Sequence, residues 1–178
     1  MMQVTFQNQP VTISGNLPKV GDKAPDFCLC TASLEDFKLS DHLGSVLILS
    51  IVPSLDTGVC ATSARKFNQE AASLEGVKVL CVSEDLPFAA DRFCTAAGIK
   101  NVMTLSDFRK DGNFGENYGV MIKDGALRGL LTRSIFVIDK EGKIAYVELV
   151  PEITMSLITL QQLKLLRNAC NNCIYIKY

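Results

Sequence analysis

The chain has 178 residues, of which 48% are hydrophobic and 21% are charged, and its formal net charge is −1. This length suits one domain with a sizeable core. The near-neutral charge argues against nucleic acid and anionic membranes as partners, and no apolar stretch reaches transmembrane length. The N-terminus lacks the basic region and long apolar core of a signal peptide, so we expect a cytoplasmic protein.

Apolar periodicity and turn residues predict a short hairpin followed by alternating strands and helices. The predicted strands are 4–6, 11–13, 37–39, 46–52, 77–83, 102–105, 132–139 and 144–149, with a weakly alternating segment at 26–31. The predicted helices are 61–74, 85–97, a turn at 114–118, and 156–168. A helix between two apolar strands indicates a parallel pair. The order predicts an α/β protein with a thioredoxin-like fold, a central mixed sheet flanked by helices, plus an N-terminal β-hairpin.

The loop from Pro53 to Cys60 joins the apolar run 46–52 to the predicted helix. Cys60 then stands at the first turn of a helix, where unpaired N–H groups and the helix dipole favour a thiolate. The Thr57 hydroxyl can fold back towards the sulfur, and Pro53 can shield it because proline has no N–H. A lone cysteine in a helix is commonly a structural residue, but three such residues in one tight loop favour a reactive thiol.

A thiolate beside a hydroxyl donor needs an electrophile, and the O–O bond of a peroxide is a good candidate. The sulfur attacks one oxygen, the other leaves as an alkoxide, and the cysteine becomes a sulfenic acid. The backbone N–H groups of Val59 and Cys60 and the Thr57 hydroxyl are candidate donors to the two oxygens.

The pattern Pro53-x-x-x-Thr57-x-x-Cys60 resembles the active-site signature of the peroxiredoxins. The longer runs 53–60 and 83–94 are similar to those of the bacterial thiol peroxidase subgroup, and the likeness extends from the N-terminal hairpin to about Thr154. The resemblance implies a peroxidase that needs no cofactor and no metal, acts on alkyl hydroperoxides in preference to hydrogen peroxide, is recycled by thioredoxin and forms a homodimer.

The same resemblance assigns roles to individual residues. It implies that Cys60 is the peroxidatic cysteine, that Thr57 orients the peroxide and that Pro53 shields the site. Arg133 matches the arginine that holds thiolate and substrate, although without the resemblance it would be interpreted as a surface charge. Cys94 matches the resolving cysteine, which implies an intrachain Cys60–Cys94 disulfide. Because the Cα atoms of a disulfide lie within about 7 Å, we expect the helix ends around both cysteines to unravel.

The other chemistry-bearing residues favour structural roles. Cys81 lies mid-strand in an apolar run and is expected in the core, while Cys28 and Cys30 are expected to be structural or exposed. The tail pair Cys170 and Cys173 forms a CxxC, but a zinc or redox role needs further partners. His42, the single histidine, is expected at the surface or in a cap.

The resemblance ends after Thr154, where the sequence departs from the subgroup before its last predicted helix. We expect one domain over residues 1–168 and a C-terminal tail, 169–178, of unknown role. Two alternatives remain open from the sequence. The protein could be a thioredoxin-fold binding module with an inert Cys60, or a thiol–disulfide oxidoreductase that uses the tail CxxC.

Overall fold

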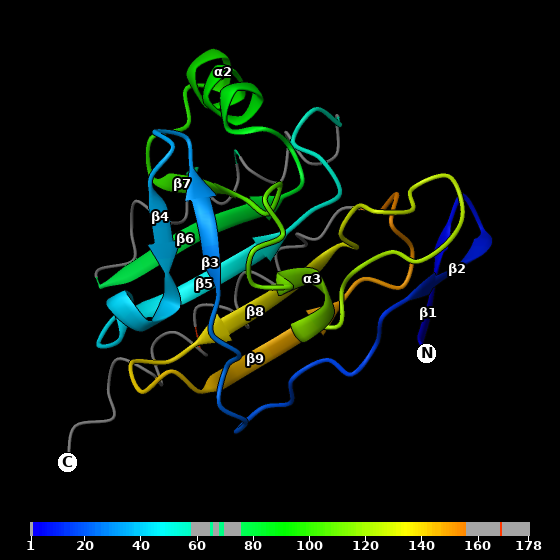
Figure 1. Cartoon of the computed structure of the whole chain (residues 1–178), viewed down its shortest axis with the longest axis horizontal. Helices are drawn as coiled ribbons and strands as arrows, with labels where there is room; N and C mark the ends of the chain where they lie inside the picture. The colour runs from blue at the N-terminus through cyan, green and yellow to red at the C-terminus, as the bar shows by residue number, and fades with distance from the viewer. Residues whose placement is uncertain (1, 58–64, 66–67, 70–75, 156–167, 169–178) are drawn as a thin grey trace.

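A seven-stranded mixed sheet forms the centre of the computed structural model, which describes residues 2–57, 65, 68–69, 76–155 and 168. The strand order is β4-β3-β7-β6-β5-β8-β9 (Figure 1). The strands are β3 (Cys28–Thr31), β4 (Asp36–Lys38), β5 (Val46–Ile51), β6 (Val77–Ser83), β7 (Val102–Ser106), β8 (Ser134–Ile138) and β9 (Ile144–Leu149). The described helices are η1 (Leu39–His42), α2 (Pro87–Ala97) and α3 (Phe114–Asn117).

The middle of the sheet is parallel, as the sequence predicted. β5 pairs with β6 and β6 pairs with β7 in parallel, while β8 and β9 add antiparallel strands on the other side of β5. All six residues of β5 are buried, as expected for a strand covered on both faces. The predicted strand 46–52 ends one residue early, at Ile51. The N–H of Val52 still donates a hydrogen bond to the carbonyl oxygen of Val82 at 3.0 Å. The pairing stops there because the next residue, Pro53, has no N–H.

The predicted strand 132–139 starts later than expected, at Ser134. The N–H of Thr132 donates to the carbonyl oxygen of Val120 at 2.8 Å instead of to a strand of the sheet. The residues before β8 are therefore held by the irregular segment 107–131. This places Arg133 at the edge of the sheet and not within a strand.

Successive side chains of a strand point to opposite faces, so the sheet buries two apolar clusters. On one face, Ala90 of α2 joins Val79, Cys81 and Val102. On the other face, Phe114 of α3 and Tyr118 pack with Leu49 and Leu80 among others. Figure 1 shows α2 beside β7 and α3 over β8. The predicted helix 85–97 is confirmed as α2, Pro87–Ala97, and the predicted turn at 114–118 is confirmed as α3, Phe114–Asn117.

The N-terminal hairpin is a separate two-stranded sheet of β1 (Met2–Phe6) and β2 (Gln9–Ile13). Its turn residues Gln7 and Asn8 have φ of 52° and 62°, which is the conformation of a tight two-residue hairpin loop. The backbone of Thr5 exchanges hydrogen bonds of 2.7 and 2.8 Å with Pro151 O and Ile153 N. The hairpin is thereby fixed against the chain that follows β9.

Two predicted helices fall largely outside the described residues. Within 61–74, Arg65, Asn68 and Gln69 are helical, and within 156–168 Asn168 is helical. The tail 169–178 is not among the described residues. In the described part of the chain, no helix combines the length and apolar character needed to cross a membrane.

Candidate active site

The loop Pro53–Thr57 leaves the C-terminal end of β5, beside the C-terminal end of the parallel strand β6. Pro53 is buried and Thr57 is exposed. The loop leads towards Cys60, which is outside the described residues, so the structure places the residues before the predicted nucleophile and not the nucleophile itself.

Hydrogen bonds hold this loop at several points. The Ser54 hydroxyl donates to Asp85 Oδ1 at 2.8 Å, and the backbone N–H of Leu55 donates to Asp85 Oδ2 at 2.6 Å. Within the loop, the Asp56 N–H donates to Ser54 Oγ at 3.2 Å, and the Thr57 hydroxyl donates to the carbonyl oxygen of Ser54 at 3.4 Å. Ser54 therefore connects Asp85 to Thr57.

A cavity of about 220 Å³ lies against this loop, and three of the predicted site residues line it. Its lining residues are Phe6, Pro53, Ser54, Thr57, Leu127, Leu130, Arg133, Ile153 and Thr154. Arg133 is only 2% exposed, and its Nε donates to the carbonyl oxygen of Ile153 at 3.0 Å. A cation buried beside a cavity stabilises an anion there more strongly than one in water would. Arg133 thus makes this cavity suited to an oxygen that gains negative charge, and Thr57 lines the same cavity.

The N-terminal hairpin supplies one wall of the cavity through Phe6. Glu152 fixes that wall: its carboxylate accepts hydrogen bonds from the Thr5 hydroxyl at 2.6 Å and from the backbone N–H groups of Gln7 and Asn8, each at 3.1 Å. It also accepts from the Thr154 hydroxyl at 2.6 Å. The bonds from Thr154 and Thr5 lower the pKa of Glu152 to about 2. Sequence reasoning missed Phe6 and Glu152, because nothing local indicates that residues so far apart in the chain meet.

Cys94, the fourth described residue of the predicted site, lies elsewhere. It is half-buried on α2, and it lines a different cavity, of about 440 Å³, together with the turn 31–35 and residues of β7. That cavity shares no lining residue with the cavity at Arg133. Burial raises the pKa of the Cys94 thiol, although a hydrogen bond with Thr104 opposes the shift. The thiol is therefore mainly protonated at neutral pH.

The remaining described cysteines do not gather into a site. Cys81 is buried in the apolar cluster under α2, as expected, Cys30 is buried in β3 and Cys28 is half-buried. Among the described residues, no group of three or more His, Cys, Asp or Glu could hold a metal ion. Cys170 and Cys173 belong to the part of the tail that is not described.

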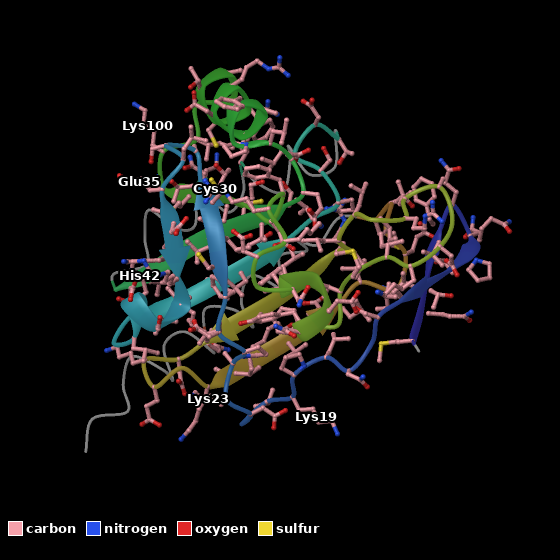
Figure 2. All side chains as sticks on the ribbon, viewed as in Figure 1. Lys19, Lys23, Cys30, Glu35, His42 and Lys100 are labelled. Atoms are coloured by element: carbon pink, nitrogen blue, oxygen red, sulfur yellow. The ribbon has the colours of Figure 1, made fainter. Side chains whose placement is uncertain are left out.

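His42 stacks on Phe37 with ring centroids 4.0 Å apart, and its Nδ1 lies 3.0 Å from Lys78 Nζ. Figure 2 shows His42 beside β4, while Cys30 lies on β3. His42 does not line the cavity at Arg133. Its position gives it no part in the chemistry proposed below.

Two largely buried carboxyl groups lie near Asp85, the residue that binds the loop, and they were not predicted from the sequence. Glu84 follows β6 and Asp107 follows β7, and their side chains are 8% and 1% exposed. Lys110 forms an ion pair with Glu84, and its Nζ lies 4.0 Å from Asp107 Oδ2. Burial raises the pKa of Glu84 to about 7, against the opposing charge of Lys110, and also raises the pKa of Asp107. The sequence signal was an acidic residue directly after each of two neighbouring parallel strands.

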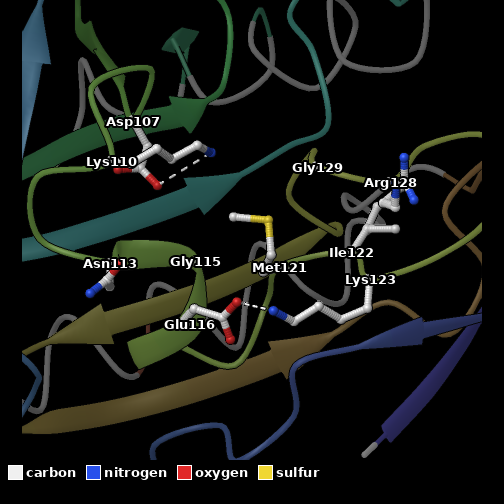
Figure 3. A pocket seen from close by; sticks show the side chains of 10 residues that line it. All are labelled: Asp107, Lys110, Asn113, Gly115, Glu116, Met121, Ile122, Lys123, Arg128 and Gly129. Atoms are coloured by element: carbon white, nitrogen blue, oxygen red, sulfur yellow. Dashed lines mark hydrogen bonds and ion pairs between the residues drawn. The ribbon is translucent and has the colours of Figure 1, made fainter.

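Asp107 and Lys110 also border a charged cavity of about 390 Å³. Figure 3 shows them on one side of it, with the ion pair between Glu116 and Lys123 on another side. Arg128 and Gly129 line this cavity, whereas Leu127 and Leu130 line the apolar one. The segment 127–130 therefore separates a charged cavity from the cavity that contains Thr57 and Arg133.

Comparison with known proteins agrees with the resemblance seen in the sequence. The sequence profile of the redoxin family matches residues 19–163. A thiol peroxidase of Bacillus subtilis is 53% identical over 154 residues, which is 86% of this chain and 90% of that protein. A thiol peroxidase of Corynebacterium glutamicum is 50% identical over 154 residues, covering 86% of this chain and 92% of that protein. The chain belongs to the redoxin family and, within it, to the thiol peroxidase group of peroxiredoxins.

The fold agrees with this membership. The crystal structure of a peroxiredoxin-like protein from Aquifex aeolicus has a TM-score of 0.88 and 44% identity, covering 95% of this chain and 98% of that chain. The predicted thioredoxin-like fold with an added N-terminal hairpin is thus confirmed. The protein is a peroxidase enzyme of the peroxiredoxin family.

The raised pKa of Glu84 predicts a pH-dependent stability. A carboxyl group whose pKa is higher in the folded state than in the unfolded state stabilises the fold below its unfolded pKa, and this contribution disappears as the pH rises through about 7. Glu84→Gln should therefore flatten the pH dependence between pH 5 and pH 8. We expect a change of about 1–2 kcal/mol, discounted because Lys110 and solvent partly screen the group.

The measurement is the free energy of unfolding in urea, monitored by circular dichroism at pH 5 and at pH 8. Glu116→Gln is the matched control, because Glu116 also pairs with a lysine but is exposed. Equal slopes for wild type, Glu84→Gln and Glu116→Gln would contradict the prediction.

Proposed function

We propose that this thiol peroxidase reduces hydroperoxides through the thiolate of Cys60, with Thr57 and Arg133 contacting the peroxide and Pro53 shielding the sulfur. The observation that supports this best is the position of Pro53, Thr57 and Arg133 around one cavity, on the loop that leads to Cys60 and on the strand edge beside it. The buried guanidinium of Arg133 provides a donor to the oxygen that gains charge, and the oxygen of Thr57, whose proton is donated to the Ser54 carbonyl, can accept from the O–H of the hydroperoxide.

The first step oxidises sulfur and reduces the peroxide. The Cys60 thiolate attacks one oxygen of the hydroperoxide, the O–O bond breaks, and its electron pair leaves with the second oxygen as an alkoxide. The alkoxide takes up a proton and departs as the alcohol, and Cys60 is left as a sulfenic acid. A cation beside the cavity favours this step, because it stabilises both the thiolate and the developing alkoxide.

The second step uses Cys94. Its thiol attacks the sulfenic acid sulfur, water is released, and an intrachain Cys60–Cys94 disulfide forms. The dithiol of thioredoxin then reduces this disulfide by thiol–disulfide exchange. Because Cys94 lines a separate cavity under α2, and a disulfide requires Cα atoms within about 7 Å, the helix ends around the two cysteines must loosen during each cycle.

The apolar walls of the cavity support organic hydroperoxides as preferred substrates. Phe6, Leu127, Leu130 and Ile153 line the cavity together with the loop and Arg133. An alkyl or aryl group placed among these side chains is removed from water, at about 25 cal/mol per Å² of apolar surface. Hydrogen peroxide has no such group and gains nothing from these walls.

We also propose that the protein acts in the cytoplasm as a homodimer, with residues 1–168 as the catalytic domain. The odd number of cysteines, seven, suits a reducing compartment, and such a compartment keeps thioredoxin reduced. The proposed chemistry uses Pro53, Thr57, Cys60, Cys94 and Arg133, so it assigns no role to the tail 169–178.

Replacing the two cysteines should separate the two steps. Cys60→Ser should abolish hydroperoxide consumption in an assay coupled to thioredoxin and thioredoxin reductase. Cys94→Ser should still consume about one equivalent of hydroperoxide but should stall before recycling. Cys28→Ser, which replaces another half-buried thiol, is the control and should turn over as the wild type does. Steady turnover by Cys60→Ser would refute the proposed function.

Removing the hairpin wall should affect organic substrates selectively. Phe6→Ala should raise the KM for cumene hydroperoxide by about tenfold, since a lost aromatic contact costs roughly 1.5 kcal/mol, and should leave hydrogen peroxide reduction nearly unchanged. Phe88→Ala, at a phenylalanine that is 68% exposed on α2, is the control and should not alter the ratio between the two substrates. Equal losses for both peroxides would show that Phe6 does not contact the substrate.

A further inference from the structure

We propose that Asp85 is a positioning residue of the peroxidase site: its carboxylate holds the loop Pro53–Thr57 in the arrangement that reduces peroxide. The inference rests on the proposed role of Cys60 and goes beyond it. Asp85 lies outside the cavity at Arg133, so it acts through the loop and not on the substrate.

Asp85 is itself firmly placed by the ends of two strands. Its Oδ2 accepts a hydrogen bond of 2.9 Å from the Ser83 hydroxyl, and its N–H donates to Ser83 Oγ at 3.2 Å. Its carbonyl oxygen accepts a bond from the Ser106 hydroxyl at the end of β7. The adjoining backbone bond runs from Asp107 N to Ser83 O at 3.0 Å. The carboxylate is therefore a fixed point of the sheet.

From this fixed point, hydrogen bonds run to the residue that is proposed to orient the peroxide. Asp85 Oδ1 accepts from the Ser54 hydroxyl at 2.8 Å and Oδ2 accepts from Leu55 N at 2.6 Å. Because a hydroxyl has one proton to donate, the bond to Asp85 sets the Ser54 hydroxyl so that its oxygen accepts from Asp56 N. The Ser54 carbonyl oxygen then accepts from the Thr57 hydroxyl.

Asp85 also lies between the loop Pro53–Thr57 and helix α2, the two segments that must move for the disulfide to form. The residue after it, Leu86, is the N-cap of α2, the helix that carries Cys94. The ion pair of Asp56 with Arg92 also links the loop to α2, at 4.0 Å with both side chains 76% exposed, and exposed pairs contribute little. Leu55 of the loop packs in one apolar cluster with Ala90 of α2. Releasing the loop for disulfide formation therefore includes breaking its bonds to Asp85.

Asp85 is thus expected to have opposite effects on the two chemical steps. It favours the oxidation of Cys60, because that step needs the loop closed around the peroxide. It opposes disulfide formation, because that step needs the loop released. A residue that only stabilised the fold would not produce opposite effects on two steps of one cycle.

The test is rapid-quench alkylation and mass spectrometry of the reduced protein mixed with cumene hydroperoxide, which follows Cys60 oxidation and the Cys60–Cys94 disulfide separately. An asparagine in place of Asp85 keeps the shape but offers one acceptor oxygen instead of two. Asp85→Asn should slow Cys60 oxidation about tenfold or more, as expected for a lost charge-assisted hydrogen bond, and should speed disulfide formation. The pH dependence of Cys60 alkylation should shift to higher pH. The reason is that the loop no longer holds in place the candidate donors that follow it, the backbone N–H groups of Val59 and Cys60.

Ser54→Ala removes one contact and should give a smaller loss in the same direction. Added to Asp85→Asn, it should cause little further loss, because both changes break the same connection. Asp41→Asn, at an exposed carboxylate of η1, is the control and should react like the wild type. Wild-type rates in Asp85→Asn, equal slowing of both steps, or fully additive losses in the double variant would overturn the inference. If wild-type Cys60 does not react with peroxide, the proposed function fails as well.

Discussion

The parallel pairing of β5 with β6 is the constraint on which the site depends. It brings the C-terminal ends of both strands to the same edge of the sheet, so that the loop after Ile51 meets the residues after Ser83. Asp85 can accept hydrogen bonds from Ser54 and Leu55 only because of this adjacency. In parallel α/β sheets this edge is where ligands bind, and here it carries the loop that leads to Cys60.

The rest of the cavity is assembled from distant parts of the chain. Arg133 is held before β8, where the backbone of Thr132 bonds to Val120 and not to the sheet. Glu152 fastens the hairpin turn beside Ile153, and this fixes the wall that includes Phe6. All of these residues precede the point after Thr154 at which the sequence departs from its subgroup. The described part of the cavity therefore belongs to the portion of the chain that resembles the subgroup.

The sequence was sufficient for the parts of the fold with strong local signals. Continuous apolar runs predicted β5, β6 and β8, and Pro87 and Gly98 bracketed α2. The sequence was insufficient where contacts between distant segments determine the position of a residue. Arg133 was found through a family resemblance alone, since its burial depends on segments that no local pattern connects. Three further features were missed for the same reason. They are the hydrogen bonds of Asp85, the carboxyl pair Glu84 and Asp107, and the contacts of Glu152 with the hairpin. Each involves a polar side chain whose role depends on the residues that face it.

The central claim is that Cys60 and Cys94 form a single redox pair, although Cys94 lines a cavity that is separate from the one at Arg133. Disulfide mapping of the full chain by mass spectrometry, after reduction and addition of one equivalent of cumene hydroperoxide, tests this most directly. A Cys60–Cys94 linkage as the main product is the predicted result. A linkage through Cys170 or Cys173, or a Cys60 that remains a free thiol after the peroxide is consumed, would contradict it.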